Sequence, residues 1–434
     1  MKYSSLNQLS KTASNLEEEY TKKIDLQQSL NKINRPLVHI PFKNSLDVVC
    51  GNGPITFARS SNATYIDRYG VLKKVSSDVP RFEEDGLLVE FGLTNLLKSS
   101  EELNNSAWGK TRVTISANAT KAPDKTTTAD GIIADSNDGS HCLLQNASSS
   151  DGMIAASCFF KPGSEDFAGI WIDFKDASSN IIGRGFVIFN LITGEYNIHT
   201  QTDCEISPSI RFLSNGWVRV EEIIKYTGSS SVDTIVYYPC SADSLTSYQF
   251  TGDGSTITTY AWGAQLENSP YCSSYIPTTT GQATRQVDAC SLPAMNNFPY
   301  KIMTMCFDYK FMPSIGYDLS LIDYDYSLFF ISKQKNKIKF RIFGYEEDTY
   351  DIDLPSLNSY VIRTDEEKFY VFVNGELVLT QQHNHDYFDG YGNMYFGSYD
   401  NSLYAAGGYI SNFRIYDKFF TDEEIKLLNL LGDD

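Results

Sequence analysis

Short runs of alternating hydrophobic and polar residues fill most of the 434-residue chain from residue 37 onward. Gly, Asn, Asp and Ser separate these runs, and short alternating strands with such turns are typical of two-sheet antiparallel sandwiches. The pattern therefore predicts a mainly β fold. The clearest of the predicted strands lie at 152–160, 169–174, 185–189 and 217–220.

Two stretches near the C-terminus carry the most specific local signals. Residues 369–375 alternate large side chains and end in Asn374-Gly375, the dipeptide that best suits a type I′ hairpin turn. Residues 407–428 contain an alternating segment followed by a short acidic segment. Thr421 and Glu424 have the spacing of a capping box, so we expect a last strand followed by a short capped helix.

The first 36 residues have a different pattern. Leu9, Leu16, Tyr20 and Leu30 recur at helical spacing with polar residues between them, and Pro36 ends the segment. This predicts a helix that either lies on its own domain or acts as a self-association or docking arm. About three interrupted heptads leave both readings open.

These patterns predict three parts: a helical attachment or oligomerisation arm at 1–36, a β-sandwich at 37–290 and a second β-sandwich at 291–434. Within the first sandwich, we expect residues 59–90 and 275–285 to lie side by side. Edge strands would then come from both ends of that region. The fold class is two antiparallel sandwiches, jelly-roll or concanavalin-like, in series after the arm.

The C-terminal part resembles a known family. The residues that carry the likeness are Phe372-Val-Asn-Gly375 and Ile410-Ser-Asn-Phe-Arg-Ile-Tyr416, and the match covers roughly 296–434. They resemble the end of a laminin-G-like, or concanavalin-like, β-sandwich. The resemblance implies a domain that binds other molecules, often sugars. Since some members are enzymes, the fold alone does not give the activity.

A second set of motifs follows one order along residues 57–290. It comprises residues 59–65, 70–72, 80–81, 86–90, 94–97, 106–108, 216–220, 252–255, 260–267, 274–278 and 284–285. This order resembles a module found in tailed-bacteriophage structural proteins. It implies a virion protein assembled in the host cytoplasm, usually part of a fibre, spike or other appendage. It also implies a carbohydrate-binding-module-like sandwich.

Charge and composition narrow the partners. The net charge is −18, from 36 basic and 54 acidic residues, and a field of that sign repels phosphate backbones. We therefore expect no nucleic-acid partner. The polar N-terminus and the lack of an apolar run of about 20 residues predict neither a signal peptide nor membrane insertion. Eight cysteines without a CxxC pattern are expected to be free, mostly buried thiols.

Enzyme signatures are largely missing from the sequence. Two DxD segments, Asp323 with Asp325 and Asp351 with Asp353, place carboxylates on one face of a strand. A glycosidase needs two well-placed carboxyl groups, and these pairs lack flanking glutamates. We therefore expect a protein that is not an enzyme, and a polysaccharide depolymerase is the alternative.

Other side chains suggest binding. Loop carboxylates are the right ligands for a structural Ca²⁺, although Asp in a Gly-rich turn is first of all a turn former. The candidate metal ligands are Asp253, Asp386 and Asp389, and no other cofactor is expected. Aromatic faces with nearby polar groups suit sugar rings. The predicted glycan-binding residues are Tyr387, Asp389, Tyr391, Asn393, Tyr395, Tyr399 and Tyr404. The four tryptophans are expected in the core.

The sequence thus predicts a non-enzymatic phage virion protein that adheres to bacterial surface glycans, with many weak contacts multiplied by copy number. The arm would bind other virion proteins and hold a homotrimer together. The alternative structural role is a capsid fibre, decoration or tail scaffold protein without glycan affinity.

Overall fold

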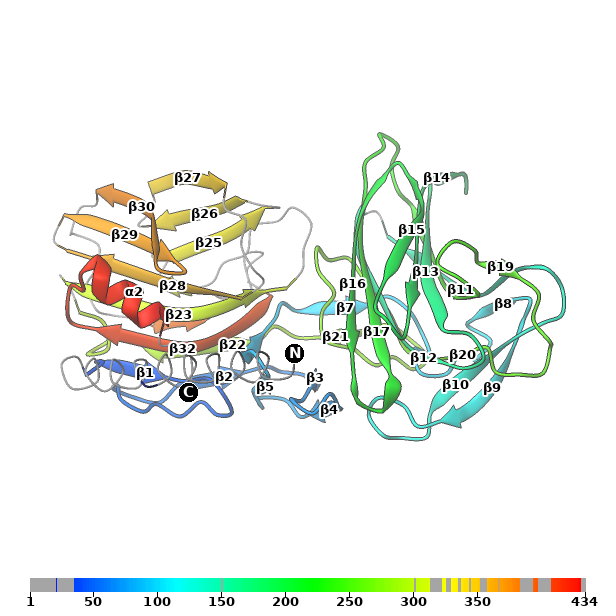
Figure 1. The fold of residues 1–434 in the computed structure, drawn as a ribbon, viewed down its shortest axis with the longest axis horizontal. Helices are drawn as coiled ribbons and strands as arrows, with labels where there is room; N and C mark the ends of the chain where they lie inside the picture. Colours follow the sequence, from blue (N-terminus) through cyan, green and yellow to red (C-terminus); the bar gives the residue numbers. More distant parts are fainter. Residues whose placement is uncertain are drawn as a thin grey trace, which may run out of the picture.

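The computed structural model shows two β-sandwiches that lie side by side, with short strands between them (Figure 1). It describes residues 21, 35–149, 151–299, 302–312, 322–324, 329–334, 337–342, 345–351, 357–365, 367–382, 393–396 and 407–430. The predicted mainly β fold is confirmed within these residues. The predicted oligomerisation residues lie outside them, namely Leu9, Leu16, Tyr20 and Leu30. No described element has its bounds within 1–36, so the helical arm stays a prediction.

The first sandwich draws both of its antiparallel sheets from residues 109–267. One sheet has the order β15-β14-β13-β18-β11-β19, with β8 beside β11. Its strands are β8 (Gly109–Thr111), β11 (Gly139–Ser148), β13 (Phe167–Lys175), β14 (Ile181–Asn190), β15 (Tyr196–Thr202), β18 (Thr234–Ala242) and β19 (Gln249–Phe250). The second sheet has the order β16-β17-β12-β20-β10-β9. Its strands are β9 (Val113–Thr120), β10 (Ala129–Ala134), β12 (Met153–Pro162), β16 (Cys204–Phe212), β17 (Val218–Tyr226) and β20 (Thr259–Glu267).

Alternation along each strand fills the core of the first sandwich. On β13, Ile170 and Ile172 are buried between the sheets, whereas Trp171 between them is only half-buried on the outer face. The four clearest predicted strands coincide with β12, β13, β14 and β17. Trp108, Trp217 and Trp262 are buried as predicted, but the core placement of Trp171 was wrong. Its position in the alternation of β13 places the side chain on the outer face of the sheet.

Two further sheets form the second sandwich. One has the order β30-β29-β28-β23-β32-β6-β5, with β1 beside β32. Its strands are β1 (Val38–Ile40), β5 (Arg81–Glu83), β6 (Gly86–Val89), β23 (Met303–Phe311), β28 (Leu357–Thr364), β29 (Lys368–Val373), β30 (Glu376–Gln382) and β32 (Gly408–Tyr416). The other has the order β2-β22-β31-β24-β25-β26-β27. Its strands are β2 (Thr56–Ala58), β22 (Ala289–Pro293), β24 (Ile322–Tyr324), β25 (Phe329–Gln334), β26 (Lys337–Ile342), β27 (Tyr345–Asp351) and β31 (Asn393–Phe396).

The local signals at the C-terminus are confirmed. Asn374 and Gly375 have φ angles of 52° and 82° and join β29 to β30, as a type I′ turn requires. After β32, helix α2 (Asp422–Leu430) begins with the predicted capping box. The Glu424 amide donates to the Thr421 hydroxyl at 3.2 Å, and the Thr421 amide donates to the Glu424 carboxylate at 2.7 Å. Ile425 packs the helix onto the outer face of the sheet that contains β23, β28, β29 and β32.

Strand pairing differs from the predicted division at residue 290. The sequence prediction assigned residues 38–58 and 81–89 to the first sandwich, but the ladders place them in the second. β1 pairs with β32 through Val38 opposite Ile415, and β6 pairs with β32 through Leu88 opposite Tyr409. These N-terminal strands have apolar side chains that only the C-terminal sheets can bury, including Val38, Ile40, Leu87 and Val89.

Between the sandwiches lie two small two-stranded sheets. β3 (Ala63–Ile66) pairs with β4 (Leu72–Val75), and β7 (Leu93–Asn95) pairs with β21 (Ala283–Arg285). The predicted proximity of residues 59–90 and 275–285 is confirmed, because the Thr64 hydroxyl donates to the Tyr275 carbonyl at 2.6 Å and Arg285 lies 3.6 Å from Glu90. These segments lie at the junction between the two sandwiches, however, and β5 and β6 form an edge of the second sandwich, not of the first. The short 3₁₀ turn η1 (Ser214–Gly216) contacts the β3–β4 hairpin through a hydrogen bond from the Ser214 amide to the Gly70 carbonyl.

One cysteine pair corrects the expectation of free thiols. Cys142 on β11 and Cys240 on β18 are direct cross-strand neighbours with Cα atoms 4.2 Å apart, and their sulfurs form a disulfide. Neighbouring positions on paired strands were invisible to sequence spacing, because 98 residues separate the two cysteines. The other six cysteines are free, and all but Cys50 are buried. In the described residues no helix has the length and apolar character to cross a bilayer.

Candidate functional site

A network of buried charges holds the junction together. Arg81 from β5 contacts both Glu90 and Asp288, with its Nη1 atom 2.7 Å from a Glu90 oxygen. Arg59 pairs with the other oxygen of Asp288 at 3.1 Å, and Arg285 lies 3.6 Å from Glu90. All five side chains are at most 1% exposed. We call this set the buried ion network.

Hydroxyl groups complete the network. Ser274 donates its backbone amide and its hydroxyl to Glu90, both at 2.7 Å. Burial alone would raise the pKa of Glu90, but Arg285, Arg81 and these two hydrogen bonds lower it to about 2. Glu90 is therefore ionised and fully partnered. The network joins residues on or next to β2, β5, β6, β21 and β22. It leaves little for a ligand to bind at Glu90.

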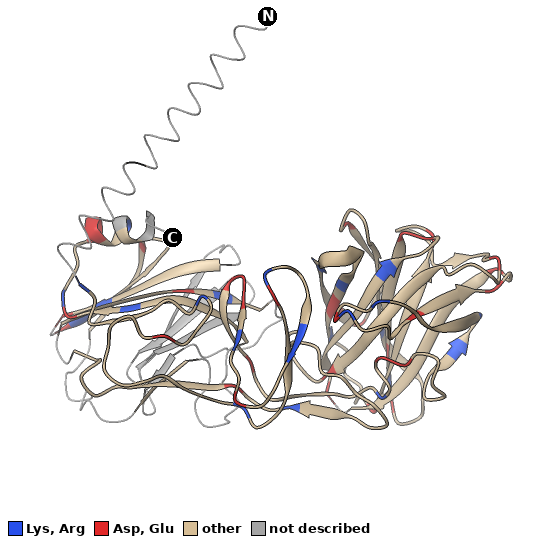
Figure 2. Cartoon of the chain, turned by 90° about the horizontal axis from the view of Figure 1, so that it is seen from below, with Lys and Arg blue, Asp and Glu red and all other residues tan. Residues whose placement is uncertain are grey.

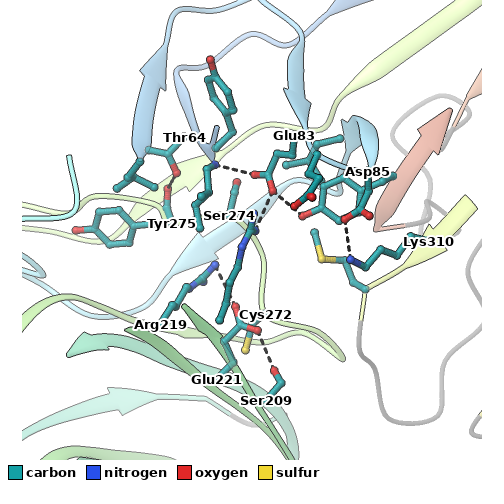
Figure 3. Close-up of a pocket in the computed structure, with 18 of the residues that line it drawn as sticks. Thr64, Glu83, Asp85, Ser209, Arg219, Glu221, Cys272, Ser274, Tyr275 and Lys310 are labelled. Carbon is teal, nitrogen blue, oxygen red and sulfur yellow. Dashed lines mark hydrogen bonds and ion pairs between the residues drawn. The ribbon is translucent and has the colours of Figure 1, made fainter. Parts of the chain in front are cut away.

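A cavity of about 280 Å³ lies beside the network, between the two sandwiches (Figure 3). We call it the inter-sandwich cavity. The first sandwich contributes β16 and β17, and the second contributes β5, β23 and β32, so both must be docked for the cavity to exist. Acidic and basic side chains, hydroxyls and three half-buried or buried tyrosines line it. They include Tyr65, Glu83, Asp85, Arg211, Arg219, Glu221, Lys310 and Tyr409.

Two ion pairs lie across or beside this cavity. Arg211 on β16 reaches Glu83 on β5 at 2.8 Å, and Lys310 reaches Asp85 at 2.7 Å. Glu83 also accepts hydrogen bonds from the Tyr409 hydroxyl and from the Ile66 amide. Figure 3 shows Glu83 where several of these contacts meet, with the Asp85–Lys310 pair beside it. The arrangement offers carboxylates and cations for hydroxyl groups, together with aromatic side chains for apolar sugar faces.

Charge distribution along the ribbon agrees with this picture. Figure 2 shows segments with Lys or Arg and segments with Asp or Glu close together in the region between the sandwiches. Opposite charges at short range there are paired, as the Arg211–Glu83 and Lys310–Asp85 contacts show. The inter-sandwich cavity is therefore polar without a strong charge of either sign.

The predicted glycan-binding loop lies mostly outside the described residues. Asn393 and Tyr395 are described, and they occupy alternate positions on β31 in the middle of a sheet, where both are half-buried. The structure does not describe the other five, namely Tyr387, Asp389, Tyr391, Tyr399 and Tyr404. The predicted aromatic patch therefore stays a prediction.

Asp253, the described member of the predicted metal ligands, is a turn former. Its carboxylate accepts hydrogen bonds from the amides of Ser255 and Thr256 and from the Thr256 hydroxyl, and these lower its pKa well below the usual range. Asp386 and Asp389 lie outside the described residues. Within the described part of the chain, no three His, Cys, Asp or Glu side chains gather as a metal would require.

The predicted carboxylate pairs are only half described. Asp323 lies on β24 and Asp351 ends β27, whereas Asp325 and Asp353 lie outside the described residues.

Trp171, half-buried on the first sandwich, is a further aromatic candidate. Its ring stacks on Phe186 at 5.3 Å, and Arg184 lies 4.6 Å from its centroid, so neighbours already occupy its surroundings.

Four members of the buried ion network belong to the sequence motifs of residues 57–290, but the sequence predicted no role for them. Arg59, Arg81, Glu90 and Arg285 each stand in one of the motifs of residues 57–290. The signal was the recurrence of single charges among apolar residues in strand-like segments, since such charges are rarely buried unless paired. Glu83, Arg211 and Lys310 of the cavity had no comparable signal.

Several comparisons with known proteins give the following results. No curated protein matches the chain. The receptor-binding domain of botulinum neurotoxin D is similar at 16% identity and a TM-score of 0.28, covering 33% of this chain and 41% of that chain. A CBM40 of a Ruminococcus gnavus IT-sialidase has 19% identity and a TM-score of 0.24, covering 30% and 84%. Domain 4 of the arabinanase AbnA from Geobacillus stearothermophilus, solved with arabinotriose, has 16% identity and a TM-score of 0.26, covering 36% and 80%.

The chain spans less than half the length of the neurotoxin domains that it matches. A family model gives a more local result. Residues 309–426 match the model described as the concanavalin A-like lectin/glucanases superfamily. This range contains β24 to β32 and the first part of α2, including both segments on which the sequence resemblance rested. The C-terminal part of the chain therefore contains a concanavalin-like domain, as predicted.

Proposed function

We propose that this protein is a structural component of a tailed-phage particle, part of a fibre or another appendage, and that it binds host surface glycans without cleaving them. The order of motifs along residues 57–290 supports the phage role. The concanavalin-like domain at 309–426 supports binding. The N-terminal arm would join three chains and attach them to other virion proteins, and the resulting multivalency would strengthen weak single contacts.

The observation that carries glycan binding is the inter-sandwich cavity. Its carboxylates and cations can exchange hydrogen bonds with sugar hydroxyls, and Tyr65 and Tyr409 offer aromatic surface for CH groups. The first sandwich and the second both contribute, so a bound sugar would contact two rigid walls. Preorganised walls reduce the ordering cost of binding.

The ion pairs of the cavity favour binding over hydrolysis. A glycosidase needs a protonated carboxyl group on one side of the scissile bond and a free carboxylate on the other. Glu83, Asp85 and Glu221 are each held by a cation, at 2.8, 2.7 and 3.2 Å. Each of these carboxyl groups is therefore engaged by a cation and does not stand free to flank a glycosidic bond. We therefore propose that the protein is not an enzyme.

Binding of the full chain to host cells tests the glycan role. The Asp85→Ala variant removes a half-buried lining carboxylate and should weaken binding to cells several-fold. Asp138→Ala changes an exposed aspartate in the turn between β10 and β11, away from the cavity, and serves as the matched control. Equal binding by both variants and the unaltered chain would exclude this cavity as the glycan site.

The position on the particle needs a separate measurement. Antibody-gold labelling of intact phage should decorate a tail fibre or another appendage. Labelling over the capsid, together with no binding to cells, would instead indicate a decoration protein without glycan affinity. A loss of viscosity when the chain is mixed with host capsule would indicate a depolymerase and contradict the non-catalytic proposal.

A further inference from the structure

The Cys142–Cys240 disulfide joins positions that the sheet itself brings together. β18 pairs with β11 on one side and with β13 on the other, and its ladder with β13 runs from Thr234 to Ala242. Backbone pairing thus fixes Cys240 opposite Cys142 without help from a covalent bond. Their Cα atoms are 4.2 Å apart, close to the spacing of about 4.5 Å for directly opposed residues of a non-hydrogen-bonded antiparallel pair.

Packing between the sheets holds the same register. Leu143, Ile235 and Tyr237 belong to the core of the first sandwich and are completely buried. The ladder between β11 and β18 continues beyond the cysteines as far as Ser148 opposite Thr234. A chain with two free thiols at this place therefore has the same strand pairing available as a chain with the disulfide. The bond can close after folding, and closure needs no rearrangement of the sheet.

None of the other six cysteines, all within the described residues, has a cysteine opposite it. On the strands, Cys158 faces Val220, Cys204 faces Tyr226, Cys290 faces Phe57 and Phe396, and Cys306 faces Val361 and Arg414. Disulfides are rare where glutathione and thioredoxin keep thiols reduced. Six free thiols beside one disulfide suit a chain that folds reduced and is oxidised later, at the single pair that the sheet aligns.

A short segment, residues 243–250, packs over the cluster that contains both cysteines. We call it the covering segment. It follows β18 directly, and its last two residues form β19, which pairs with β11 at Gly139 and Ser140. Its Leu245 and Tyr248 side chains pack against the cluster. Since Cys142 is only 4% exposed and Cys240 is not exposed at all, an oxidant or a reductant needs a local opening to reach the sulfurs.

We propose that Cys142 and Cys240 form a redox lock, open as two thiols in reducing surroundings and closed as a disulfide in oxidising ones. Closure takes two exchange steps with a small disulfide such as oxidised glutathione. The thiolate of one cysteine attacks a sulfur of oxidised glutathione, and one glutathione thiolate leaves. The thiolate of the other cysteine then attacks the mixed disulfide and releases the second glutathione. The two cysteines lose two electrons and two protons, and oxidised glutathione gains both.

Closure stabilises the first sandwich against unfolding. The bond spans a sequence separation of 98 residues, and the strands from β12 to β17 lie between its two ends. In the loop-entropy account, a cross-link over so long a segment strongly restricts the unfolded chain. A virion protein would meet both surroundings in this order, the host cytoplasm during assembly and an oxidising medium after release. The redox lock goes beyond the proposed function and does not depend on glycan binding.

Thiol counts and thermal melting of the full chain test the lock. Cells that produce the chain in a reducing cytoplasm are lysed in denaturant with N-ethylmaleimide, and mass spectrometry should then find adducts on all eight cysteines. After the folded chain is incubated with oxidised glutathione, the adducts on Cys142 and Cys240 should be lost. The circular dichroism spectrum should stay the same, and the melting temperature should rise by roughly 5–15 °C.

Two variants serve as a matched pair. Cys142→Ala should abolish the rise on oxidation, whereas Cys306→Ala, which removes a buried free thiol on β23, should retain it. Each variant is compared with and without oxidised glutathione, so a change in its basal stability does not affect the result. A disulfide already closed in the reducing cytoplasm would overturn the lock. So would two thiols that persist after oxidation, a reduced chain that does not fold cooperatively, or equal melting temperatures of the open and closed forms.

Discussion

The two sandwiches are built in opposite ways. Every strand of the first lies within residues 109–267, whereas the second combines strands at 38–58, 81–89 and 289–293 with strands at 303–416. The first is contiguous in sequence, and the second encloses it. A fold of the second kind ties the ends of the chain together around an inserted domain. Its stability therefore depends on segments that lie more than 200 residues from the concanavalin-like motifs.

Cutting the chain tests this difference with the largest expected effect. A fragment of residues 296–434 lacks β1, β2, β5, β6 and β22, and with them Val38, Ile40, Leu87, Val89 and Leu292 of the core. Burying each such side chain contributes roughly 1.5–3 kcal/mol, so their sum rivals the 5–15 kcal/mol of a whole domain. We expect this fragment to show no cooperative thermal transition by circular dichroism.

A fragment of residues 59–288 is the matched case. It retains all thirteen strands of the first sandwich, the β3–β4 hairpin and the five residues of the buried ion network. We expect it to unfold cooperatively. A cooperative transition in the 296–434 fragment, at a melting temperature close to that of the full chain, would mean that the N-terminal strands decorate the second sandwich without supporting it.

Local features were predictable from the sequence because neighbours in sequence determine them. The Asn374-Gly375 turn needs only two residues with positive φ, and the capping box needs only Thr421 and Glu424. Pairing partners were not predictable. The sequence around Val38 alternates in the same way whether its strand pairs with β32 or with a strand of the first sandwich. Periodicity shows which face of a strand is buried, but not which strand lies beside it.

The candidate sites were less predictable than the fold for a related reason. The inter-sandwich cavity requires Glu83 and Arg211, which are 128 positions apart, to meet across one space. Each alone is an ordinary charged residue in a polar segment. Arg81 was visible within a motif, but its role depends on Asp288, which belongs to no motif. Only the junction between the sandwiches gives these residues a common function.

Arg81→Met should produce the second largest loss of stability, because Arg81 contacts both carboxylates of the buried ion network at the junction of the two sandwiches. The substitution leaves Glu90 and Asp288 buried without their main partner. Removing one member of a buried ion pair typically costs about 3–5 kcal/mol. Denaturant unfolding of the full chain should show this loss. Lys310→Met breaks an ion pair whose partners are 32% and 26% exposed and should cost about 1 kcal/mol or less. Equal losses in the two variants would contradict a structural role for the buried ion network.

Glu222 allows a finer test inside the first sandwich alone. It alternates with Val220 and Ile224 on β17, whose side chains belong to the core, and it is completely buried. Neither of its carboxyl oxygens has a hydrogen-bond partner among the described residues. Burial raises its pKa well above the ordinary value of 4.5, more than the nearby amides of Ile170 and Val187 lower it. The folded protein therefore keeps this proton at pH values above 4.5, where a free carboxyl group loses it.

The sign of the pH dependence follows from this proton. Above pH 4.5 the unfolded chain releases it while the folded chain keeps it, so the free energy of unfolding falls as pH rises. One proton corresponds to about 1.4 kcal/mol per pH unit. Glu222→Gln should remove this slope and leave the contributions of all other groups in place. We expect the variant to gain stability relative to the unaltered chain between pH 5 and 8 in denaturant unfolding. Glu221→Gln, on the neighbouring ion-paired residue, should not show this gain. A difference between Glu222→Gln and the unaltered chain that stays constant over that range would mean that Glu222 is ionised in the fold, and the first sandwich would then contain an uncompensated charge.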